Sequence, residues 1–143
     1  MTSAEIAVRR DRWLRAIGYG LLAEISTIIT IIAIVTIYRY AIAKGLAEAD
    51  YTAFSERVGA IVGILGGTLY VFLFARLLMR HLSTRFLAHG IVAALAAVAF
   101  SVGGSIAAHR GAPSAYILAS ALKISAGALA GFLAARARQP RPV

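Results

Sequence analysis

Four long apolar stretches constrain this chain more than any other feature of its sequence. They cover about residues 15–39, 57–79, 86–108 and 114–135. Each reaches the roughly 20 residues that a helix needs to cross about 30 Å of hydrocarbon. Membrane-spanning strands are about 10 residues long and alternate in polarity, unlike these stretches. The sequence therefore predicts an all-α fold, an integral membrane bundle of four transmembrane helices.

The composition agrees with this class of protein. The chain has 143 residues, 60% of them hydrophobic, and its mean hydropathy is +0.80. Too little polar surface remains to cover a soluble core, and the length corresponds to one domain. We therefore expect a single transmembrane domain over residues 1–143. The chain has no cysteine, which excludes disulfides, thiol catalysis and thiolate metal ligands.

Basic residues gather on one side of the predicted bundle, although the net charge is +9 overall. Ten arginines precede the first stretch, join the second to the third, or follow the fourth: Arg9, Arg10, Arg12, Arg15, Arg76, Arg80, Arg85, Arg136, Arg138 and Arg141. The other side carries fewer basic residues, and Glu48, Asp50 and Glu56 offset them. The positive-inside rule then places both termini in the cytoplasm. We expect the arginines to contact anionic lipid rather than nucleic acid.

The connection between the first two stretches is the only sizeable one. Residues 40–54 are expected to form an interfacial helix or to extend the first helix. Arginine far outnumbers lysine, and Ala and Gly are abundant. This bias is typical of a high-GC bacterial genome and predicts a multi-pass protein of the bacterial inner membrane.

Small residues recur at four-residue spacing, which lets membrane helices approach closely. Gly59, Gly63 and Gly67 repeat in the second stretch, and Gly127 and Gly131 repeat in the fourth. These glycines are predicted to pack helices together, either within one bundle or between copies in a homo-oligomer.

Two further patterns concern the origin of the chain. GGTLYVFLFAR (66–76), a short basic loop and FLAHGIVAAL (86–95) resemble the middle of small four-helix bacterial membrane proteins of unknown function. That resemblance implies the fold and no activity. GTLYVFLFAR (67–76) also matches GALAGFLAAR (127–136) in the distance from glycine to arginine, which predicts a duplicated helical hairpin.

Two charged residues lie deep inside apolar stretches, Glu24 in the first and Lys123 in the fourth. A charge at mid-membrane costs roughly 2.5–3.5 kcal/mol, which the surrounding Ile, Leu and Val residues offset at about 0.3–0.6 kcal/mol each. Intramembrane ionisable residues usually face the interior and pair. Glu24 and Lys123 differ in depth by about 6 Å along the helix axes. Two long side chains can span this offset if the first and fourth helices are neighbours.

Three interpretations of this charged pair remain open. The two residues form a structural ion pair, Glu24 is the titrating group of a proton or cation transporter, or Glu24 meets a partner subunit or lipid headgroup. A glutamate in the first of four helices resembles the small multidrug resistance exporters. This chain is longer than those exporters, has a larger first connection, and differs around the glutamate.

Histidines and serines provide the remaining candidates. His89 is a candidate ligand, but a bis-histidine haem site needs a second imidazole at its depth. Ser101, Ser105, Ser120 and Ser125 are interpreted as interhelical hydrogen-bonding residues; a Ser–Lys dyad with Lys123 is the enzymatic alternative. Sequence signatures of metalloproteases, P-loops, dinucleotide sites and nucleophile elbows are lacking. We expect no catalytic residue, metal or cofactor.

These patterns favour a non-enzymatic function. The chain is predicted to be a subunit, assembly factor or accessory factor that joins a homo-oligomer or larger membrane complex through its glycine-rich faces. The alternative is a small proton- or cation-coupled transporter or channel that uses Glu24 and Lys123.

Overall fold

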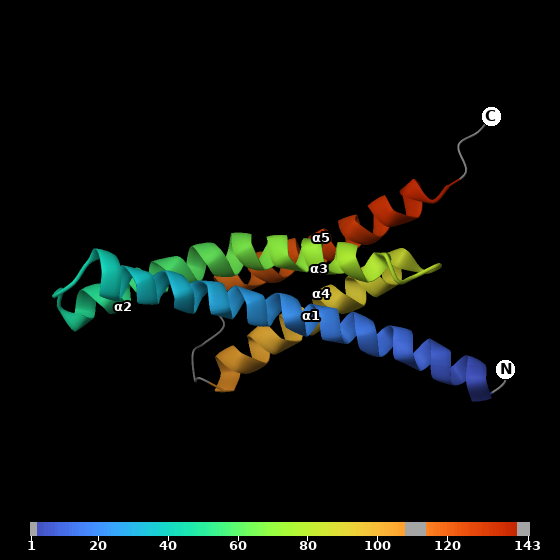
Figure 1. The fold of residues 1–143 in the computed structure, drawn as a ribbon, viewed down its shortest axis with the longest axis horizontal. Helices are drawn as coiled ribbons and strands as arrows, with labels where there is room; N and C mark the ends of the chain where they lie inside the picture. Colours follow the sequence, from blue (N-terminus) through green and yellow to red (C-terminus); the bar gives the residue numbers. More distant parts are fainter. Residues whose placement is uncertain (1–2, 108–113, 140–143) are drawn as a thin grey trace.

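The computed structural model describes residues 3–107 and 114–139. Its elements are α1 (Ser3–Ile37), the π-helix η1 (Tyr38–Ile42), α2 (Glu48–Ile61), the π-helix η2 (Val62–Gly66), α3 (Gly67–Met79), α4 (Phe86–Ala107) and α5 (Ser114–Ala137) (Figure 1). Within the described ranges, four helical spans are long and apolar enough to cross a membrane. The predicted all-α bundle is thus confirmed as a fold.

The first connection contains more helix than loop, which agrees with the helical structure expected for residues 40–54. Helix α1 continues through η1 to Ile42, and α2 begins at Glu48, so most of segment 40–54 is helical. Helix α1 also begins at Ser3 rather than near residue 15. The apolar stretch is shorter than the helix, because helical hydrogen bonds continue into the polar sequence before residue 15. The predicted end of the third helix at residue 108 lies outside the described residues.

Polar contacts hold the tip of the α1–α2 hairpin together. The guanidinium of Arg39 donates two hydrogen bonds to Glu48, Nη1 to Oε1 at 3.0 Å and Nη2 to Oε2 at 2.8 Å. Tyr51 Oη donates to the carbonyl of Ala43 at 2.6 Å and accepts from the amide of Leu46 at 3.1 Å. Gly45 has φ +84°, a left-handed conformation that glycine adopts without steric cost. These bonds explain why the tip is ordered over so few residues.

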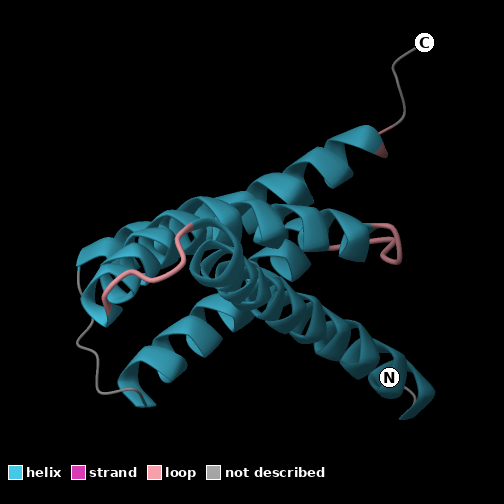
Figure 2. Cartoon of the chain, turned by 60° about the vertical axis from the view of Figure 1, so that its left-hand side comes forward, coloured by secondary structure: helices cyan, strands magenta, loops and turns pink. Residues whose placement is uncertain are grey.

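The four long helices pack in the order α1, α4, α5, α3 around the bundle. Helix α4 lies between α1 and α5, and α3 contacts the same two helices from the other side. Figure 2 shows the start of α1 and the end of α5 spreading apart. Helices α1 and α5 are therefore diagonal partners rather than neighbours. The sequence-based pairing of the two charges required these helices to be adjacent; in the structure the charges meet across the interior of the bundle instead.

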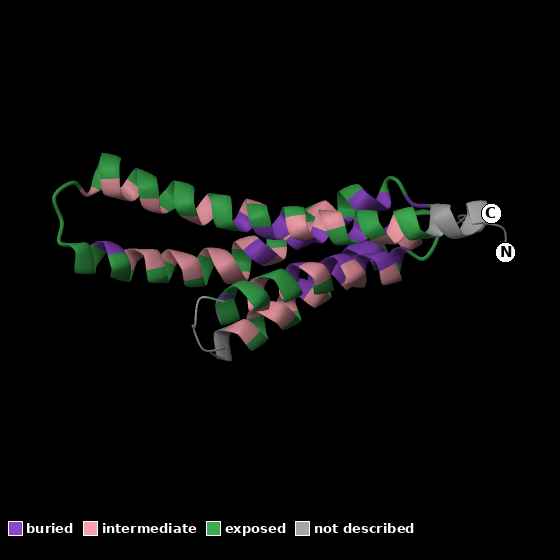
Figure 3. Cartoon of the chain, turned by 90° about the horizontal axis from the view of Figure 1, so that it is seen from below, coloured by how far each residue is buried: buried purple, intermediate pink, exposed green. Residues whose placement is uncertain are grey.

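The bundle core occupies only part of the molecule. Its buried residues form two clusters, one around Leu78 and Phe86 and one around Ala23 and Val71. In Figure 3 the buried residues gather where the four helices overlap, and the α1–α2 hairpin extends beyond them. The hairpin extends beyond the buried residues because the helices differ in length. Helix α1 has 35 residues and α4 has 22, or about 52 Å against about 33 Å.

The start of α1, the end of α5 and the α3–α4 connection all lie at one end of the bundle (Figure 1). Arg138 ties this end together. Its Nη1 donates to the carbonyl of Leu82 and its Nη2 to that of Met79 at 3.2 Å. Its guanidinium also lies over the ring of Phe86, 4.8 Å from the centroid. The arginine that directly follows α5 thus bonds one carbonyl at the end of α3 and one in the α3–α4 connection.

Candidate functional site

A buried polar cluster joins three helices in the bundle interior. Glu24 comes from α1, Ser101 from α4 and Lys123 from α5. Lys123 Nζ lies 2.6 Å from Glu24 Oε2 and donates to Ser101 Oγ at 3.0 Å. Ser101 Oγ donates in turn to Glu24 Oε1. Glu24 is 6% exposed and Lys123 is 3% exposed, so the two charges pair with each other almost out of contact with solvent.

The diagonal arrangement explains why long side chains occupy this cluster. Glu24 and Lys123 belong to helices that face each other across the bundle, so the side chains must bridge the space between the two backbones. Ser101 is short, and it reaches both charges because α4 lies between α1 and α5. We refer to Glu24, Ser101 and Lys123 together as the polar triad.

Helix α3 covers the polar triad with a glycine. A Cβ atom on Gly67 would lie 2.7 Å from Lys123 Cε and 3.3 Å from its Nζ, closer than non-bonded atoms normally approach. The absence of a side chain at Gly67 therefore makes room for the lysine. The π-helix η2 ends one residue earlier, at Gly66, and π-helical turns within α-helices are frequent near functional sites. All four long helices thus contribute to the cluster.

Hydroxyl groups continue the polar band along α1. Thr27 Oγ1 donates to the carbonyl of Ala23 at 2.9 Å, one turn from Glu24. Thr30 Oγ1 bonds the carbonyl of Ser26 at 2.9 Å and the hydroxyl of Tyr70 at 2.8 Å. These hydroxyls form hydrogen bonds with backbone carbonyls or with each other. The carboxylate of Glu24 bonds Ser101 and Lys123 instead.

The hydrogen-bond pattern limits the chemistry that the polar triad supports. A Ser–Lys dyad needs a neutral lysine whose lone pair accepts the serine proton. Here Lys123 is the donor toward Ser101, and the serine proton is directed to Glu24. In a low-dielectric interior a buried ion pair needs additional hydrogen bonds to offset its desolvation, and the loss of either partner leaves an unpaired charge. The geometry fits an ion pair better than it fits an activated nucleophile.

His89 lies apart from the polar triad, near the first turn of α4. Its Nδ1 is 2.9 Å from the carbonyl of Arg85, and its ring stacks on Trp13 of α1 with centroids 4.2 Å apart and planes 11° apart. His89 is 3% exposed, and its Nε2 is buried with no hydrogen-bond partner in the described part of the chain. Among those same residues, no group of three His, Asp or Glu side chains is placed to hold a metal.

The predicted packing glycines divide into two groups. A Cβ on Gly127 would run into the carbonyl of Gly90, and one on Gly131 would lie 2.7 Å from Leu87 Cα. These two glycines, with Gly67, pack inside the chain. A Cβ on Gly59 or Gly63 would meet nothing within 4 Å. Gly63 lies within the π-helix η2 and Gly67 begins α3 directly after it, so of these three glycines Gly67 alone makes a close approach to another helix.

The sequence predicted Glu24 and Lys123 as a pair and Ser101 as an interhelical hydrogen-bonding residue, and the structure confirms that Ser101 bonds across helices, although the sequence did not identify Glu24 as one of its partners. Serine is common in helices and carries no signal of its partner. A positional signal existed, because Ser101 follows Ala93 and Ala97 at four-residue spacing, and Ala93 and Ala97 are both buried. That spacing placed Ser101 on the buried face of α4, whereas the identity of its partners required the packing of α1 and α5.

Comparisons with protein families, with curated proteins and with solved structures found no match for this chain. Its function is therefore argued from the bundle and the polar triad themselves.

Proposed function

We propose that this chain is a small multi-pass protein of the bacterial inner membrane with a non-catalytic role, as a subunit, assembly factor or accessory factor. In this proposal both termini are cytoplasmic and the α1–α2 hairpin extends on the opposite side. The observation that carries it is the closed polar triad, in which the two deeply buried charges satisfy each other and hold the helices in place.

The placement of charge supports a membrane location. Apart from Glu24 and Lys123, the charged residues of the described helices lie toward the helix ends. Large apolar side chains such as Ile29, Ile32 and Leu65 are exposed along the helices. A soluble protein rarely exposes so much contiguous apolar surface, whereas lipid covers it without cost. Helix α4, about 33 Å long, matches the roughly 30 Å hydrocarbon thickness.

A double-mutant cycle tests the structural role of the polar triad. We expect Glu24→Gln and Lys123→Met each to lower the unfolding free energy in detergent by about 3–5 kcal/mol, because each leaves a buried charge unpaired. The double variant should recover most of this loss. Additive losses, or no loss in either single variant, would refute a structural pair.

The subunit role is tested by association. A Cβ on Gly63 meets nothing within the chain, so Gly63→Leu should leave the unfolding temperature of the bundle unchanged while reducing the mass of any complex isolated from membranes. Gly18 has equally open surroundings and lies outside the four-residue repeat, so Gly18→Leu is the matched control. A complex insensitive to Gly63→Leu would exclude this glycine face as the contact.

The alternative is proton- or cation-coupled transport through Glu24 and Lys123. The observation that favours it is the position of a carboxylate and an ammonium together within the helical spans, since intramembrane ionisable pairs commonly form proton and ion pathways. Proteoliposomes containing the wild-type protein should then show a pH-driven flux that Glu24→Gln abolishes. A flux that persists in Glu24→Gln would exclude Glu24 as the coupling group.

A further inference from the structure

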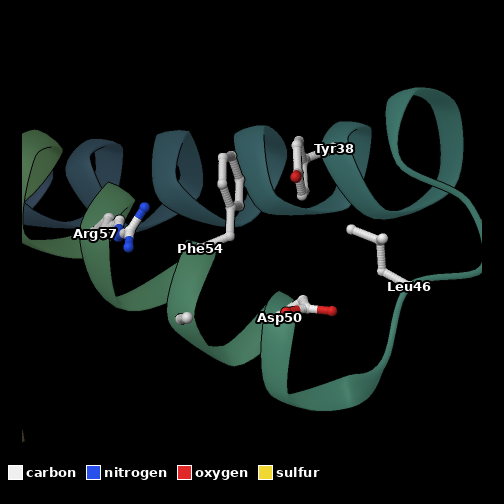
Figure 4. A pocket seen from close by; sticks show the side chains of 6 residues that line it. Tyr38, Leu46, Asp50, Phe54 and Arg57 are labelled. Carbon is white, nitrogen blue, oxygen red and sulfur yellow. The ribbon is translucent and has the colours of Figure 1, made fainter.

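A second polar site lies at the far end of the molecule, between η1 and α2. A pocket of about 380 Å³ is lined by Tyr38, Leu46, Asp50, Ala53, Phe54 and Arg57. The rings of Tyr38 and Phe54 stack with centroids 3.6 Å apart. Figure 4 shows Asp50 and Arg57 on the same helix with Phe54 between them. The pocket therefore has an aromatic wall and one charge of each sign.

The two charges of this pocket have no side-chain partner in the part of the chain that the structure describes. Neither Asp50 nor Arg57 forms a side-chain hydrogen bond or ion pair within the described residues. By contrast, the nearby charged residues Arg39 and Glu48 form an ion pair with each other. An unpaired carboxylate and an unpaired guanidinium that line one pocket form a complementary site for a ligand carrying both a cation and an anion.

The pocket lies at the boundary of the apolar sequence. Arg57 is the last charged residue before the uncharged segment 58–75, and Asp50 lies two helical turns farther out, about 10 Å along the axis. Tyr38 ends the apolar part of the first span. Aromatic side chains are enriched at this depth, and an arginine side chain extends from it toward the polar layer. The positive charge is thus the deeper one and the negative charge the outer one.

We propose that this pocket binds the headgroup of a phospholipid in which a phosphodiester is joined by two carbons to a primary ammonium group. Arg57 holds the phosphate through paired N–H donors, Asp50 accepts hydrogen bonds from the ammonium, and Tyr38 and Phe54 pack against the two carbons that join the phosphate to the ammonium. The depth order of the two charges matches that of the headgroup, because the phosphate is closer to the acyl chains. The site rests on the proposed membrane location.

Lipid-dependent thermal stability of the detergent-purified chain tests this site. The probes are phosphatidylethanolamine, phosphatidylcholine and phosphatidylglycerol with identical acyl chains. Because a ligand that binds only the folded state raises its unfolding temperature, phosphatidylethanolamine should raise it most. Asp50→Asn should weaken the ethanolamine lipid on the order of tenfold, to the level of phosphatidylglycerol. Arg57→Gln should weaken both of these lipids.

Matched variants separate the pocket from general surface charge. Glu56 and Lys44 are exposed and do not line the pocket, so Glu56→Gln and Lys44→Gln should retain the wild-type lipid preference. Equal effects of the three lipids, or equal effects of Glu56→Gln and Asp50→Asn, would overturn the headgroup site. Free phosphoethanolamine that stabilises the protein as strongly as the lipid would also overturn it in favour of a soluble ligand.

The same samples keep this site distinct from the proposed membrane location. Extraction of the chain from cell membranes only by detergent, with no preference among the lipids, refutes the headgroup site alone. Recovery of the chain from the aqueous fraction refutes the membrane proposal itself, and the headgroup site with it.

Discussion

At the scale of single residues, Ser101 is the group that connects the two buried charges. It donates to Glu24 and accepts from Lys123, so its removal leaves one donor and one acceptor of the polar triad with fewer bonds. We expect Ser101→Ala to lower the unfolding free energy by about 1–3 kcal/mol. Ser125 is exposed on α5, and Ser125→Ala should change stability by less than about 0.5 kcal/mol. Chemical unfolding in detergent measures both, and equal losses would show that Ser101 is not part of a cooperative cluster.

His89 gives a second prediction at this scale, because its Nε2 is buried without a partner while its ring stacks on Trp13. His89→Phe keeps an aromatic ring there and removes the unsatisfied nitrogen. The carbonyl of Arg85 still accepts from the backbone N–H of residue 89 at 3.1 Å. We therefore expect His89→Phe to change the unfolding free energy by less than about 1 kcal/mol, and His89→Ala to lower it by roughly 2–3 kcal/mol.

The comparison of these two variants also tests the candidate ligand role of His89. If His89→Phe destabilises the protein as much as His89→Ala does, Nε2 has a partner in the working protein. A Soret absorption band in the purified wild type, lost in His89→Phe, would identify that partner as haem.

At the scale of elements, backbone contact between α4 and α5 holds the second hairpin together. Gly90 and Gly127 face each other so closely that a Cβ on either would overlap the carbonyl of the other. Backbone cannot yield as a flexible side chain does, so Gly127→Ala should lower the unfolding free energy by about 1–3 kcal/mol. Gly103 on α4 has open space around its Cα. Gly103→Ala should therefore stabilise the helix by about 0.5–1 kcal/mol. Thermal unfolding of both variants in the same detergent checks the contrast, and a neutral Gly127→Ala would contradict the close approach.

The sequence predicted the existence of the four helical spans better than their limits. The length of the apolar stretches was sufficient to predict the spans, because a helix that crosses a bilayer needs about 20 apolar residues. A Thr-x-x-Glu capping pattern at residues 2–5 favours the helical start of α1 at Ser3, whereas apolar length alone does not indicate helix before Trp13. Regular spacing predicted one packing stripe for Gly59, Gly63 and Gly67, but only Gly67 of the three packs closely on another helix. The sequence of residues 62–66 carries no signal for the π-helix η2 that includes Gly63.

The polar triad could also be predicted only in part from the sequence. Hydropathy and charge were sufficient to select Glu24 and Lys123, because isolated charges are conspicuous in apolar sequence. The sequence could not show that α1 and α5 are diagonal, nor that Ser101 lies between them, because helix order depends on the sum of all contacts. The match between 67–76 and 127–136 stays a prediction of duplication, and the two glycines that begin it, Gly67 and Gly127, have different neighbours.

At the scale of the whole molecule, the unequal lengths of the two hairpins define an asymmetric protein. The α4–α5 hairpin is about as long as a bilayer is thick, and the α1–α2 hairpin continues beyond it with its own polar tip (Figure 1). Exposed arginines such as Arg76, Arg80 and Arg136 lie at the opposite end. In the proposed orientation the arginines meet the anionic cytoplasmic leaflet, and the hairpin tip carries the headgroup pocket on the outer side.

The absence of cysteine from the sequence makes this orientation directly measurable. Single cysteines at Ser83, in the α3–α4 connection, and at Ala49, near the hairpin tip, both replace exposed residues. In intact cells a membrane-impermeant maleimide should label Ala49→Cys and leave Ser83→Cys unlabelled until the membrane is permeabilised, because the positive-inside rule places the arginine-rich end in the cytoplasm. The reverse pattern would invert the bundle and place the headgroup pocket in the cytoplasmic leaflet. Labelling of both sites in intact cells would contradict a fixed orientation across a membrane.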